Sequence, residues 1–395
     1  MSTTTVLSIS PPPRDGLSIG LLDAPALRWG ILGCGRVSND FVLALQHVSS
    51  AQAVACAARS KESAQTFANK FDIPKAYGAY DDLLADENVD IVYVGNVHAF
   101  RRQIGEKCLM AGKNVLLEKP FACKAEDAEY LVKLARSKKL FCMEGMWTRF
   151  FPAVEQARRL VMEEKVIGEV VSVYSDFNFN ASDSEEYPGS FVYNRKVGGG
   201  ASLLVAPYPV AAATLFFDGA VPEKCMSVGQ LDPVTGVDLQ AAAVLKFAST
   251  GDVAPAMDEG QKEENTPKLP GSGVASLSYG LLGESEEETV VLGTKGRIVI
   301  KSPGHCPTKL TVSLKATGRG NAAVSNMYEF PLPEDNGGYF YPNSAGFAYE
   351  AAAVARCIAA GLKEAPQFSL DETLNSASII EKIQKQIGVK HFDEE

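Results

Sequence analysis

A lysine stands at the end of an apolar segment in Leu116-Leu117-Glu118-Lys119-Pro120. Much earlier in the chain, the turn Gly33-Cys34-Gly35 follows another apolar segment. If both segments are strands of one doubly wound sheet, their carboxyl ends lie at the same edge, which is where such sheets bind ligands. A lysine at that edge can reach into a dinucleotide pocket. The pattern therefore predicts that Lys119 lies beside a bound nicotinamide.

The glycine turn itself has the residue types that a dinucleotide needs. Gly33 permits a tight turn, and Gly35 lets the backbone approach a pyrophosphate. Ser38, a small residue, occupies the third glycine position, where helix and strand pack closely. Arg36 and Val37 complete this turn, and the helix predicted after it offers free N–H groups and a positive dipole end that favour phosphate. A structural turn is the alternative, but the strand–turn–helix context favours a cofactor site.

The second predicted strand ends in Ala57-Ala58-Arg59-Ser60-Lys61. An NAD-specific site has an acidic residue here for the ribose 2′-hydroxyl, and none occurs between Gln52 and Lys61. Arg59 can pair with a 2′-phosphate, and Ser60 can donate to it. A solvent-exposed arginine is the alternative. The position favours the phosphate, so we predict NADP(H) as the cofactor.

Apolar segments alternate with amphipathic ones in the first part of the chain, which indicates βαβ units and a parallel sheet. The predicted strands are 27–32, 53–58, 91–94, 115–117 and 140–143, and the predicted helices are 38–47, 62–71, 101–111 and 126–138. After Trp147 the pattern changes to strands at 169–179, 225–230, 241–247, 275–279, 289–292, 297–300 and 310–314, with late helices at 347–360 and 370–387.

This pattern predicts an α/β protein in which a Rossmann domain with a doubly wound parallel sheet precedes an α+β domain with a large, mainly antiparallel, open sheet. We predict a disordered tail at residues 1–26, the NADP-binding domain at 27–147 and a substrate and dimerisation domain at 148–395. Residues 250–273 are predicted to be a flexible inserted loop, because three prolines and a charged stretch leave little apolar surface to bury.

The bulk composition excludes several classes of function. The 395-residue chain is 46% hydrophobic with a net charge of −10, and no basic block provides a nucleic-acid surface. No apolar segment approaches the roughly 20 residues that span a bilayer. The eight cysteines and four histidines show no metal-ligand spacing, and the cysteines suit reduced thiols in a reducing compartment. We expect a cytoplasmic protein without a signal peptide or a metal site.

Several separate motifs together resemble the Gfo/Idh/MocA oxidoreductase family, and within it the dimeric dihydrodiol dehydrogenase branch, which also oxidises D-xylose with NADP⁺. The resemblance extends from about residue 27 to about residue 390. The matching segments are Leu27-Arg28-Trp29-Gly30-Ile31, Asp72-Ile73-Pro74-Lys75-Ala76-Tyr77-Gly78, Glu118-Lys119-Pro120, Trp147-Thr148-Arg149-Phe150-Phe151-Pro152, Gly293-Thr294-Lys295-Gly296 and Tyr349-Glu350-Ala351.

The resemblance implies a catalytic pair, Lys119 and Tyr208. It implies that Lys119 lies near the reacting carbon, that Pro120 shapes its loop, and that Tyr208 donates and accepts the proton. A tyrosine hydroxyl has an ordinary pKa near 10 and needs a nearby cation to act at neutral pH. The structural alternatives are a solvated loop lysine and a core tyrosine between Pro207 and Pro209.

The resemblance also implies further contacts around the cofactor and the substrate. Glu118 and His98 are expected beside the cofactor, in addition to Lys119 and Pro120. His98, Arg101, Trp147 and Arg149 are expected to contact the substrate. The resemblance implies that this substrate lies between the two domains, and that the open sheet forms a homodimer interface.

Two positions depart from the family pattern. The family aspartate that helps to orient the substrate is Leu204 in this chain, and Arg101 stands where the family has a histidine. We expect an NADP-dependent oxidoreductase acting on a sugar or a vicinal diol, of the D-xylose or trans-dihydrodiol type. Leu204 and Arg101 leave two alternatives: a non-catalytic or redirected NADP(H)-binding protein, and an enzyme for an acidic substrate that Arg101 contacts.

Overall fold

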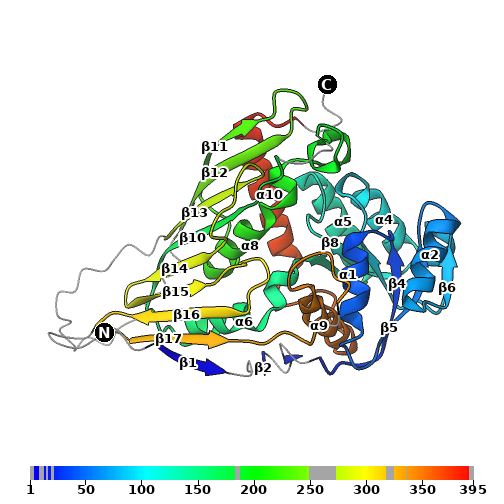
Figure 1. Ribbon diagram of the computed structural model, residues 1–395, viewed down its shortest axis with the longest axis horizontal. Coiled ribbons are helices and arrows are strands. Elements are labelled where there is room, and N and C mark those ends of the chain that lie inside the picture. Colours follow the sequence, from blue (N-terminus) through cyan, green and yellow to red (C-terminus); the bar gives the residue numbers. More distant parts are fainter. Residues whose placement is uncertain are drawn as a thin grey trace.

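The computed structural model describes residues 4–8, 13–14, 17–18, 22–182, 187–248, 273–316, 324–335 and 337–390. The chain forms two sheets with helices between and around them (Figure 1). Of the predicted loop at 250–273, only Gly273 is described, and it begins a strand. The rest of that loop lies outside the described residues.

The first half is a six-stranded parallel sheet with the strand order β6-β5-β4-β7-β8-β9. Its strands are β4 (Leu27–Leu32), β5 (Ala51–Ala57), β6 (Lys75–Tyr77), β7 (Ile91–Val94), β8 (Asn114–Glu118) and β9 (Cys142–Gly145). Its helices are α1 (Arg36–Leu45), α2 (Lys61–Phe71), α3 (Tyr80–Leu84), α4 (Arg101–Met110) and α5 (Ala125–Lys138). The strand order reverses at β4, so β4 and β7 flank the crevice in which a ligand of this fold binds.

The second half contains a nine-stranded sheet with the order β1-β17-β16-β15-β14-β10-β13-β12-β11. Its strands are β1 (Thr4–Ser8), β10 (Val170–Asn178), β11 (Lys224–Leu231), β12 (Asp238–Phe247), β13 (Gly273–Gly280), β14 (Thr289–Gly293), β15 (Gly296–Ile300), β16 (Lys309–Leu314) and β17 (Val324–Glu329). Only the pairs β1–β17 and β10–β13 are parallel, so the predicted α/β fold with a mainly antiparallel second sheet is confirmed. Residues 1–26 were predicted to be a disordered tail, but they include strand β1 and the short paired strands β2 (Pro13–Arg14) and β3 (Leu17–Ser18).

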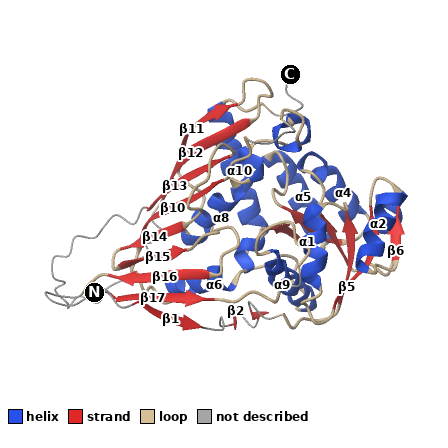
Figure 2. Ribbon diagram, viewed as in Figure 1, coloured by secondary structure: helices blue, strands red, loops and turns tan. Residues whose placement is uncertain are grey.

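Helices cover one face of the large sheet, and no described helix covers the opposite face (Figure 2). The covering helices are α6 (Pro152–Arg158), α7 (Ala201–Leu204), α8 (Pro207–Phe216) and α10 (Leu370–Ile387), while α9 (Phe347–Ala359) packs against α1. The sequence did not predict α8 because this helix is apolar on all sides and its residues show no helical periodicity. Its first turn carries Tyr208, so this helix positions a candidate catalytic residue.

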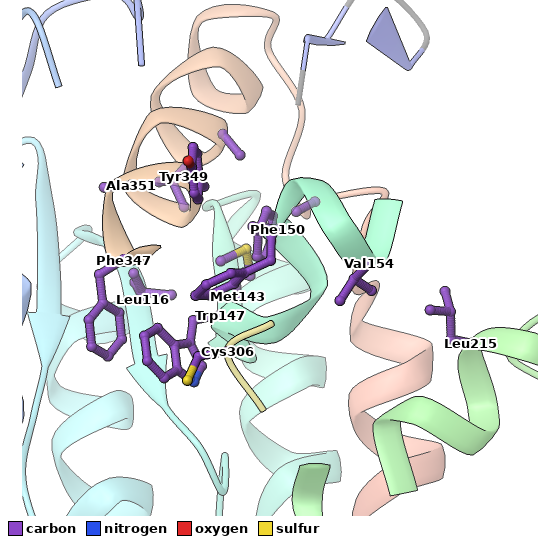
Figure 3. Packing of buried hydrophobic residues seen from close by; sticks show 14 of the residues in the cluster. Leu116, Met143, Trp147, Phe150, Val154, Leu215, Cys306, Phe347, Tyr349 and Ala351 are labelled. Atoms are coloured by element: carbon purple, nitrogen blue, oxygen red, sulfur yellow. The ribbon is translucent and has the colours of Figure 1, made fainter. Parts of the chain in front are cut away.

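One hydrophobic core joins the two halves of the molecule. Leu116 and Met143 of the parallel sheet lie in the same cluster as Trp147, Phe347 and Cys306 from the second half (Figure 3). The indole ring of Trp147 stacks on the ring of Phe347, with centroids 4.2 Å apart. This shared packing fixes the orientation of the second domain over the carboxyl edge of the parallel sheet.

No single helix among the described residues is long and apolar enough to cross a membrane. The segments Arg195–Leu204 and Pro207–Phe216 meet the length and composition criteria only when joined across a 42° bend.

Candidate active site

The turn after β4 forms a cradle for a diphosphate. Gly33 has a φ of +88°, a conformation that favours glycine. A Cβ added to Gly33 would meet the side chain of Asn96 at 3.1 Å, whereas a Cβ on Gly35 would meet nothing within 4 Å. The space beside Gly35 lies at the N-terminus of α1, where free N–H groups favour an anion. These residues fit the pyrophosphate of a dinucleotide, and Arg36 and Val37 lie in the first turn of the same helix.

The end of β5 presents an exposed arginine. Arg59 is exposed and makes no hydrogen bond or ion pair with any other described residue. Ser60, which the sequence predicted to donate to a 2′-phosphate, caps α2, and its hydroxyl accepts from the Ser63 backbone N–H at 3.2 Å. The Arg59 guanidinium is therefore available to an added phosphate, while the Ser60 hydroxyl already has a structural role.

Lys119 lies at the carboxyl end of β8 and reaches across to the second domain. Its ammonium donates to the backbone carbonyl of Leu204 at 2.7 Å and lies 4.5 Å from the centroid of the Tyr208 ring. Burial lowers the pKa of Lys119 to about 8, against the opposing influence of the Glu118 carboxylate, and Arg101 lowers it further. The predicted pair of Lys119 and Tyr208 is thus brought together, and the Leu204 carbonyl satisfies one donor of the ammonium.

Two buried charges brace the loop that carries Lys119. Glu118 accepts from the Tyr93 hydroxyl at 2.9 Å and from the Lys119 backbone N–H at 3.1 Å. Arg101 donates to the backbone carbonyl of Pro120 at 2.7 Å and to that of Asn96 at 3.0 Å. Burial raises the pKa of Glu118 and lowers that of Arg101, and each charge opposes the shift of the other. Arg101 therefore holds the loop in place, and the substrate contact expected for it stays a prediction.

His98 connects the cofactor edge to the second domain. Its Nδ1 lies 2.8 Å from the backbone carbonyl of Gly198, so Nδ1 carries the hydrogen. Burial lowers the pKa of His98 well below its ordinary value, and Arg101 acts in the same direction. His98 is consequently neutral at physiological pH, its Nε2 is a hydrogen-bond acceptor, and the charge of Lys119 also acts to lower its pKa.

Tyr208 lies between the lysine and a group of aromatic rings. The Trp147 indole N–H donates to the Tyr208 hydroxyl at 3.2 Å. Burial raises the pKa of Tyr208 well above 10, Glu118 raises it further, and the bond from Trp147 opposes the shift. Trp147, predicted as a substrate contact, therefore contacts Tyr208 and orients the phenol ring.

Arg149 has the surroundings of a structural residue. Its side chain is only 3% exposed and pairs with Glu372 at 2.8 Å. The guanidinium also donates to the carbonyls of Ala211 and Gln367, at 2.6 and 3.0 Å. These bonds tie α8 to the start of α10. Arg149 also lines the pocket beside Tyr208, and its contact with a substrate stays a prediction.

A pocket beside Tyr208 contains residues that the sequence did not single out. Its lining includes Thr148, Asp176, Phe177, Tyr208 and His305. The imidazole of His305 stacks on the ring of Phe177, with centroids 4.7 Å apart and planes inclined by 15°. His305 lies in a loop far from the recognisable motifs, so no spacing in the sequence could have indicated it. The described residues contain no group of three His, Cys, Asp or Glu side chains that could hold a metal ion.

Together these contacts arrange a cation, a phenol and an aromatic pocket at the carboxyl edge of the parallel sheet. A phenol can take a proton from a substrate hydroxyl, and a cation beside it favours that transfer. The cradle beside Gly35 lies at the same edge. The arrangement can therefore support the oxidation of an alcohol or the reduction of a carbonyl next to a dinucleotide.

Comparison with known proteins identifies both halves of the chain. Residues 27–146 match the family "Oxidoreductase family, NAD-binding Rossmann fold", and residues 154–299 match the "GFO/IDH/MocA C-terminal domain". Trans-1,2-dihydrobenzene-1,2-diol dehydrogenase from Sus scrofa is 36% identical over 367 residues, which cover 92% of this chain and 98% of that protein. The enzyme of the same name from Homo sapiens is 35% identical over 366 residues, with the same coverage of both chains.

Solved structures have the same fold at lower sequence identity. A 3-ketoreductase from Actinomadura kijaniata, in complex with NADP and TDP-benzene, superposes with a TM-score of 0.72 at 23% identity. A levoglucosan dehydrogenase in complex with NADH and levoglucosan gives a TM-score of 0.75 at 17% identity. Each alignment covers 92% of this chain and 98% of the other chain.

Proposed function

This chain belongs to the Gfo/Idh/MocA family of oxidoreductases, and on that premise we propose that it is an NADP-dependent dehydrogenase that oxidises a sugar or a vicinal diol, of the D-xylose or trans-dihydrodiol type. The observation that carries the proposal is the Lys119 ammonium, which lies 4.5 Å from the centre of the Tyr208 ring and reaches this position across the two domains. Two apolar residues at these positions would pack without the free-energy cost of burying an ammonium and a phenol hydroxyl. A role in chemistry therefore explains this pair better than packing does.

The glycine cradle and Arg59 support NADP(H) as the cofactor. The backbone at Gly33 and Gly35 would hold the diphosphate, and the exposed guanidinium of Arg59 would hold the 2′-phosphate. When bound, the oxidised nicotinamide supplies the hydride acceptor. No acidic residue lies between Gln52 and Lys61, where a site for the 2′-hydroxyl of NAD would place one.

In the proposed reaction, Tyr208 takes the proton of the substrate hydroxyl while the carbinol carbon is oxidised. Lys119 stabilises the negative charge that develops on the phenol and the substrate oxygen. The bond from Trp147 holds the Tyr208 hydroxyl in one orientation. Arg101 and Glu118 keep the Lys119 loop rigid, so the ammonium does not need to reorganise during the reaction.

The aromatic residues around Tyr208 support a substrate with a ring. Phe177, His305 and Trp147 contact Tyr208, and an aromatic face binds the apolar side of a sugar or a cyclic diol. The relatives with 34–36% identity are named for a cyclic diol substrate, trans-1,2-dihydrobenzene-1,2-diol.

A non-catalytic role is the second candidate, and Leu204 is the observation that favours it. The side chain of Leu204 packs against the hydrophobic core and cannot bind a substrate hydroxyl. Its backbone carbonyl binds Lys119, so the lysine is held without a carboxylate. In this alternative the protein binds NADP(H) without turnover.

We also propose that the protein is a homodimer formed through the uncovered face of the large sheet. Met226 and Val228 on this face are 72% and 75% exposed, and Val244 lies opposite Met226 in the neighbouring strand with 48% exposure. A contiguous exposed apolar surface of this kind marks an interaction site. Sedimentation equilibrium tests the proposal: wild type is expected to be a dimer that Val228→Lys dissociates, and a monomeric wild type at micromolar concentration would exclude it.

A turnover screen tests the proposed activity. NADPH binding to wild type and Tyr208→Phe is measured first, by fluorescence titration, to show that both proteins hold the cofactor. NADP⁺ reduction is then followed with D-xylose, other sugars and trans-diols. We expect turnover by wild type and a loss of about 100-fold or more in Tyr208→Phe at unchanged NADPH affinity. Tight NADPH binding without turnover on any substrate would instead support the non-catalytic alternative.

A further inference from the structure

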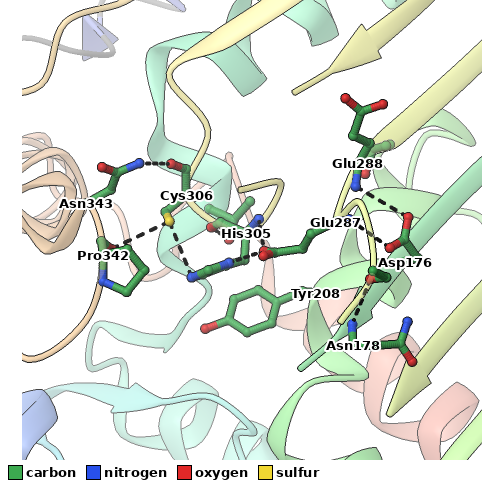
Figure 4. Close-up of polar contacts among 12 residues, drawn as sticks. Asp176, Asn178, Tyr208, Glu287, Glu288, His305, Cys306, Pro342 and Asn343 are labelled. Atoms are coloured by element: carbon green, nitrogen blue, oxygen red, sulfur yellow. Dashed lines mark hydrogen bonds and ion pairs between the residues drawn. The ribbon is translucent and has the colours of Figure 1, made fainter. Parts of the chain in front are cut away.

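A histidine stands next to the proposed proton donor and acceptor. The His305 ring lies beside the Tyr208 ring, with centroids 5.3 Å apart, and its side chain is only 10% exposed. In Figure 4 the Tyr208 hydroxyl and the Nε2 edge of His305 point to the same side of the cluster. The imidazole is thus placed where a proton could move between the two groups.

Glu287 holds this imidazole from the opposite edge. Its Oε1 accepts both from the backbone N–H of His305, at 3.2 Å, and from the ring Nδ1. Glu287 itself has a φ of +54°, a conformation that costs a non-glycine residue about 1–3 kcal/mol. The bond from the Glu287 N–H to Asp176 at 2.9 Å and the bond from the Gly304 N–H to the Glu287 carbonyl at 2.8 Å hold it there. Three segments therefore converge to fix one carboxylate on one histidine nitrogen.

This contact determines which nitrogen can accept a proton. A carboxylate only accepts, so Nδ1 donates to Glu287 and Nε2 has the lone pair. The Cys306 sulfur lies 3.3 Å from Nε2 and 3.6 Å from the Pro342 carbonyl. Burial raises the pKa of the Cys306 thiol well above its ordinary value, so the sulfur keeps its single hydrogen and can direct it to the Pro342 carbonyl instead. Nε2 is then available to a second donor.

Tyr208 needs such an acceptor. A neutral phenol in a buried site cannot take the substrate proton unless it gives up its own. Lys119 stabilises the resulting charge but is itself a cation at neutral pH and therefore a poor acceptor. A histidine backed by a carboxylate is the arrangement that accepts a proton from a hydroxyl elsewhere in enzymes, because the carboxylate stabilises the imidazolium that forms.

We propose that His305, held by Glu287, is the relay residue that receives the proton of Tyr208. The inference rests on the proposed dehydrogenase function. The substrate O–H bond breaks and its proton goes to the Tyr208 oxygen, while the phenol's own proton passes through one bridging water to Nε2 of His305. Bound NADP⁺ would accept the electron pair of the carbinol C–H bond as hydride, leaving a carbonyl product. His305 then releases its proton to solvent beside Glu287, whose side chain is 16% exposed.

His305 acts through Tyr208, so its test must separate a relay from simple packing. His305→Phe keeps a flat ring against Phe177 but removes both nitrogens, whereas His305→Ala opens space for added imidazole. His47→Ala is the matched control, because His47 lies just after α1 and, within the described part of the chain, forms a side-chain hydrogen bond only with Tyr339, at 3.3 Å. Each variant is assayed for NADPH affinity, KM and kcat, with and without imidazole in the buffer.

The relay predicts a kcat that falls about 100-fold in both His305→Phe and His305→Ala, with KM and NADPH affinity within about threefold of wild type. Imidazole should restore kcat about tenfold or more in His305→Ala and leave wild type and His47→Ala unchanged. Full kcat in His305→Phe, or no rescue of His305→Ala, would overturn the relay while leaving the dehydrogenase intact. Absence of turnover in wild type would overturn the proposed function and the relay together.

Discussion

Leu204→Asp is the substitution that most directly examines the departure from the family pattern. The Lys119 ammonium donates to the backbone carbonyl of residue 204 at 2.7 Å, so a carboxylate on that residue would lie within a few ångströms of the charge. Burial lowers the pKa of Lys119 to about 8 in the wild type. A negative charge nearby would oppose this shift and stabilise the protonated form.

The size of the effect follows from the geometry. At a separation of roughly 5 Å, and with an effective dielectric constant of about 20, a carboxylate stabilises the ammonium by about 3 kcal/mol. This free energy corresponds to about 2 pKa units, which would bring the pKa of Lys119 to about 10. Leu204→Asn is the matched control, because it has the same shape and polarity without the charge.

The assay is the pH dependence of amine modification at Lys119. Acetylation of this residue is followed by mass spectrometry, because only the neutral amine reacts. We expect a midpoint near pH 8 in wild type and in Leu204→Asn, and near pH 10 in Leu204→Asp. A midpoint that stays near pH 8 in Leu204→Asp, or that moves equally in Leu204→Asn, would refute the assignment of residue 204 as the electrostatic partner of Lys119.

Three further predictions follow from the structure. Arg59→Ala should weaken NADPH binding about 10- to 100-fold in a fluorescence titration and leave NADH binding unchanged; equal losses for both cofactors would contradict the 2′-phosphate contact. Burial raises the pKa of Glu144 from an ordinary 4.5 to about 7, so the folded state binds this proton more tightly than the unfolded chain, and the stability this provides is lost as the pH rises from about 4.5 to about 7. The difference in unfolding free energy between Glu144→Gln and wild type, measured by urea unfolding, should therefore shift by about 3 kcal/mol in favour of Glu144→Gln from about pH 4 to about pH 8. A difference that does not depend on pH would exclude this cause. Asp40 accepts from the N–H groups of Phe340 and Tyr341 and from the Ser344 hydroxyl, so Asp40→Ala should lower the unfolding free energy by about 3–5 kcal/mol, and a change below about 1 kcal/mol would contradict that role.

Most of the parallel sheet could be predicted from the sequence, because its strands are short apolar segments and its helices are longer amphipathic segments between them. Strand β6 (Lys75–Tyr77) was missed because three residues are too few to show alternation. Helix α8 was missed because burial on every side removes the polar stripe on which helix prediction depends. The order of strands in the large sheet depends on pairings between distant segments, such as β10 with β13 and β14, which no local pattern encodes.

The candidate site was predictable only where residues follow strands or match the family pattern. Lys119 and the glycine turn are of this kind, and the structure brings Lys119 to Tyr208. Arg149 matches a family segment, but its role depends on Glu372, more than two hundred positions later in the chain. His305 and Glu287 come from two loops, one before β14 and one after β15, and the pairing of Thr289 with Ile300 brings these loops together. No motif in the sequence linked the two residues.

Isotope transfer is the measurement that tests the proposed dehydrogenase function most directly. D-xylose or a trans-diol that is deuterated at the carbinol carbon is incubated with NADP⁺ and wild-type protein, and the mass of the reduced cofactor is measured. We predict that NADPH carries one deuterium from the substrate, and that Tyr208→Phe produces little or none although it binds NADPH. Tight cofactor binding by wild type without labelled NADPH from any substrate of either class would contradict the proposed function.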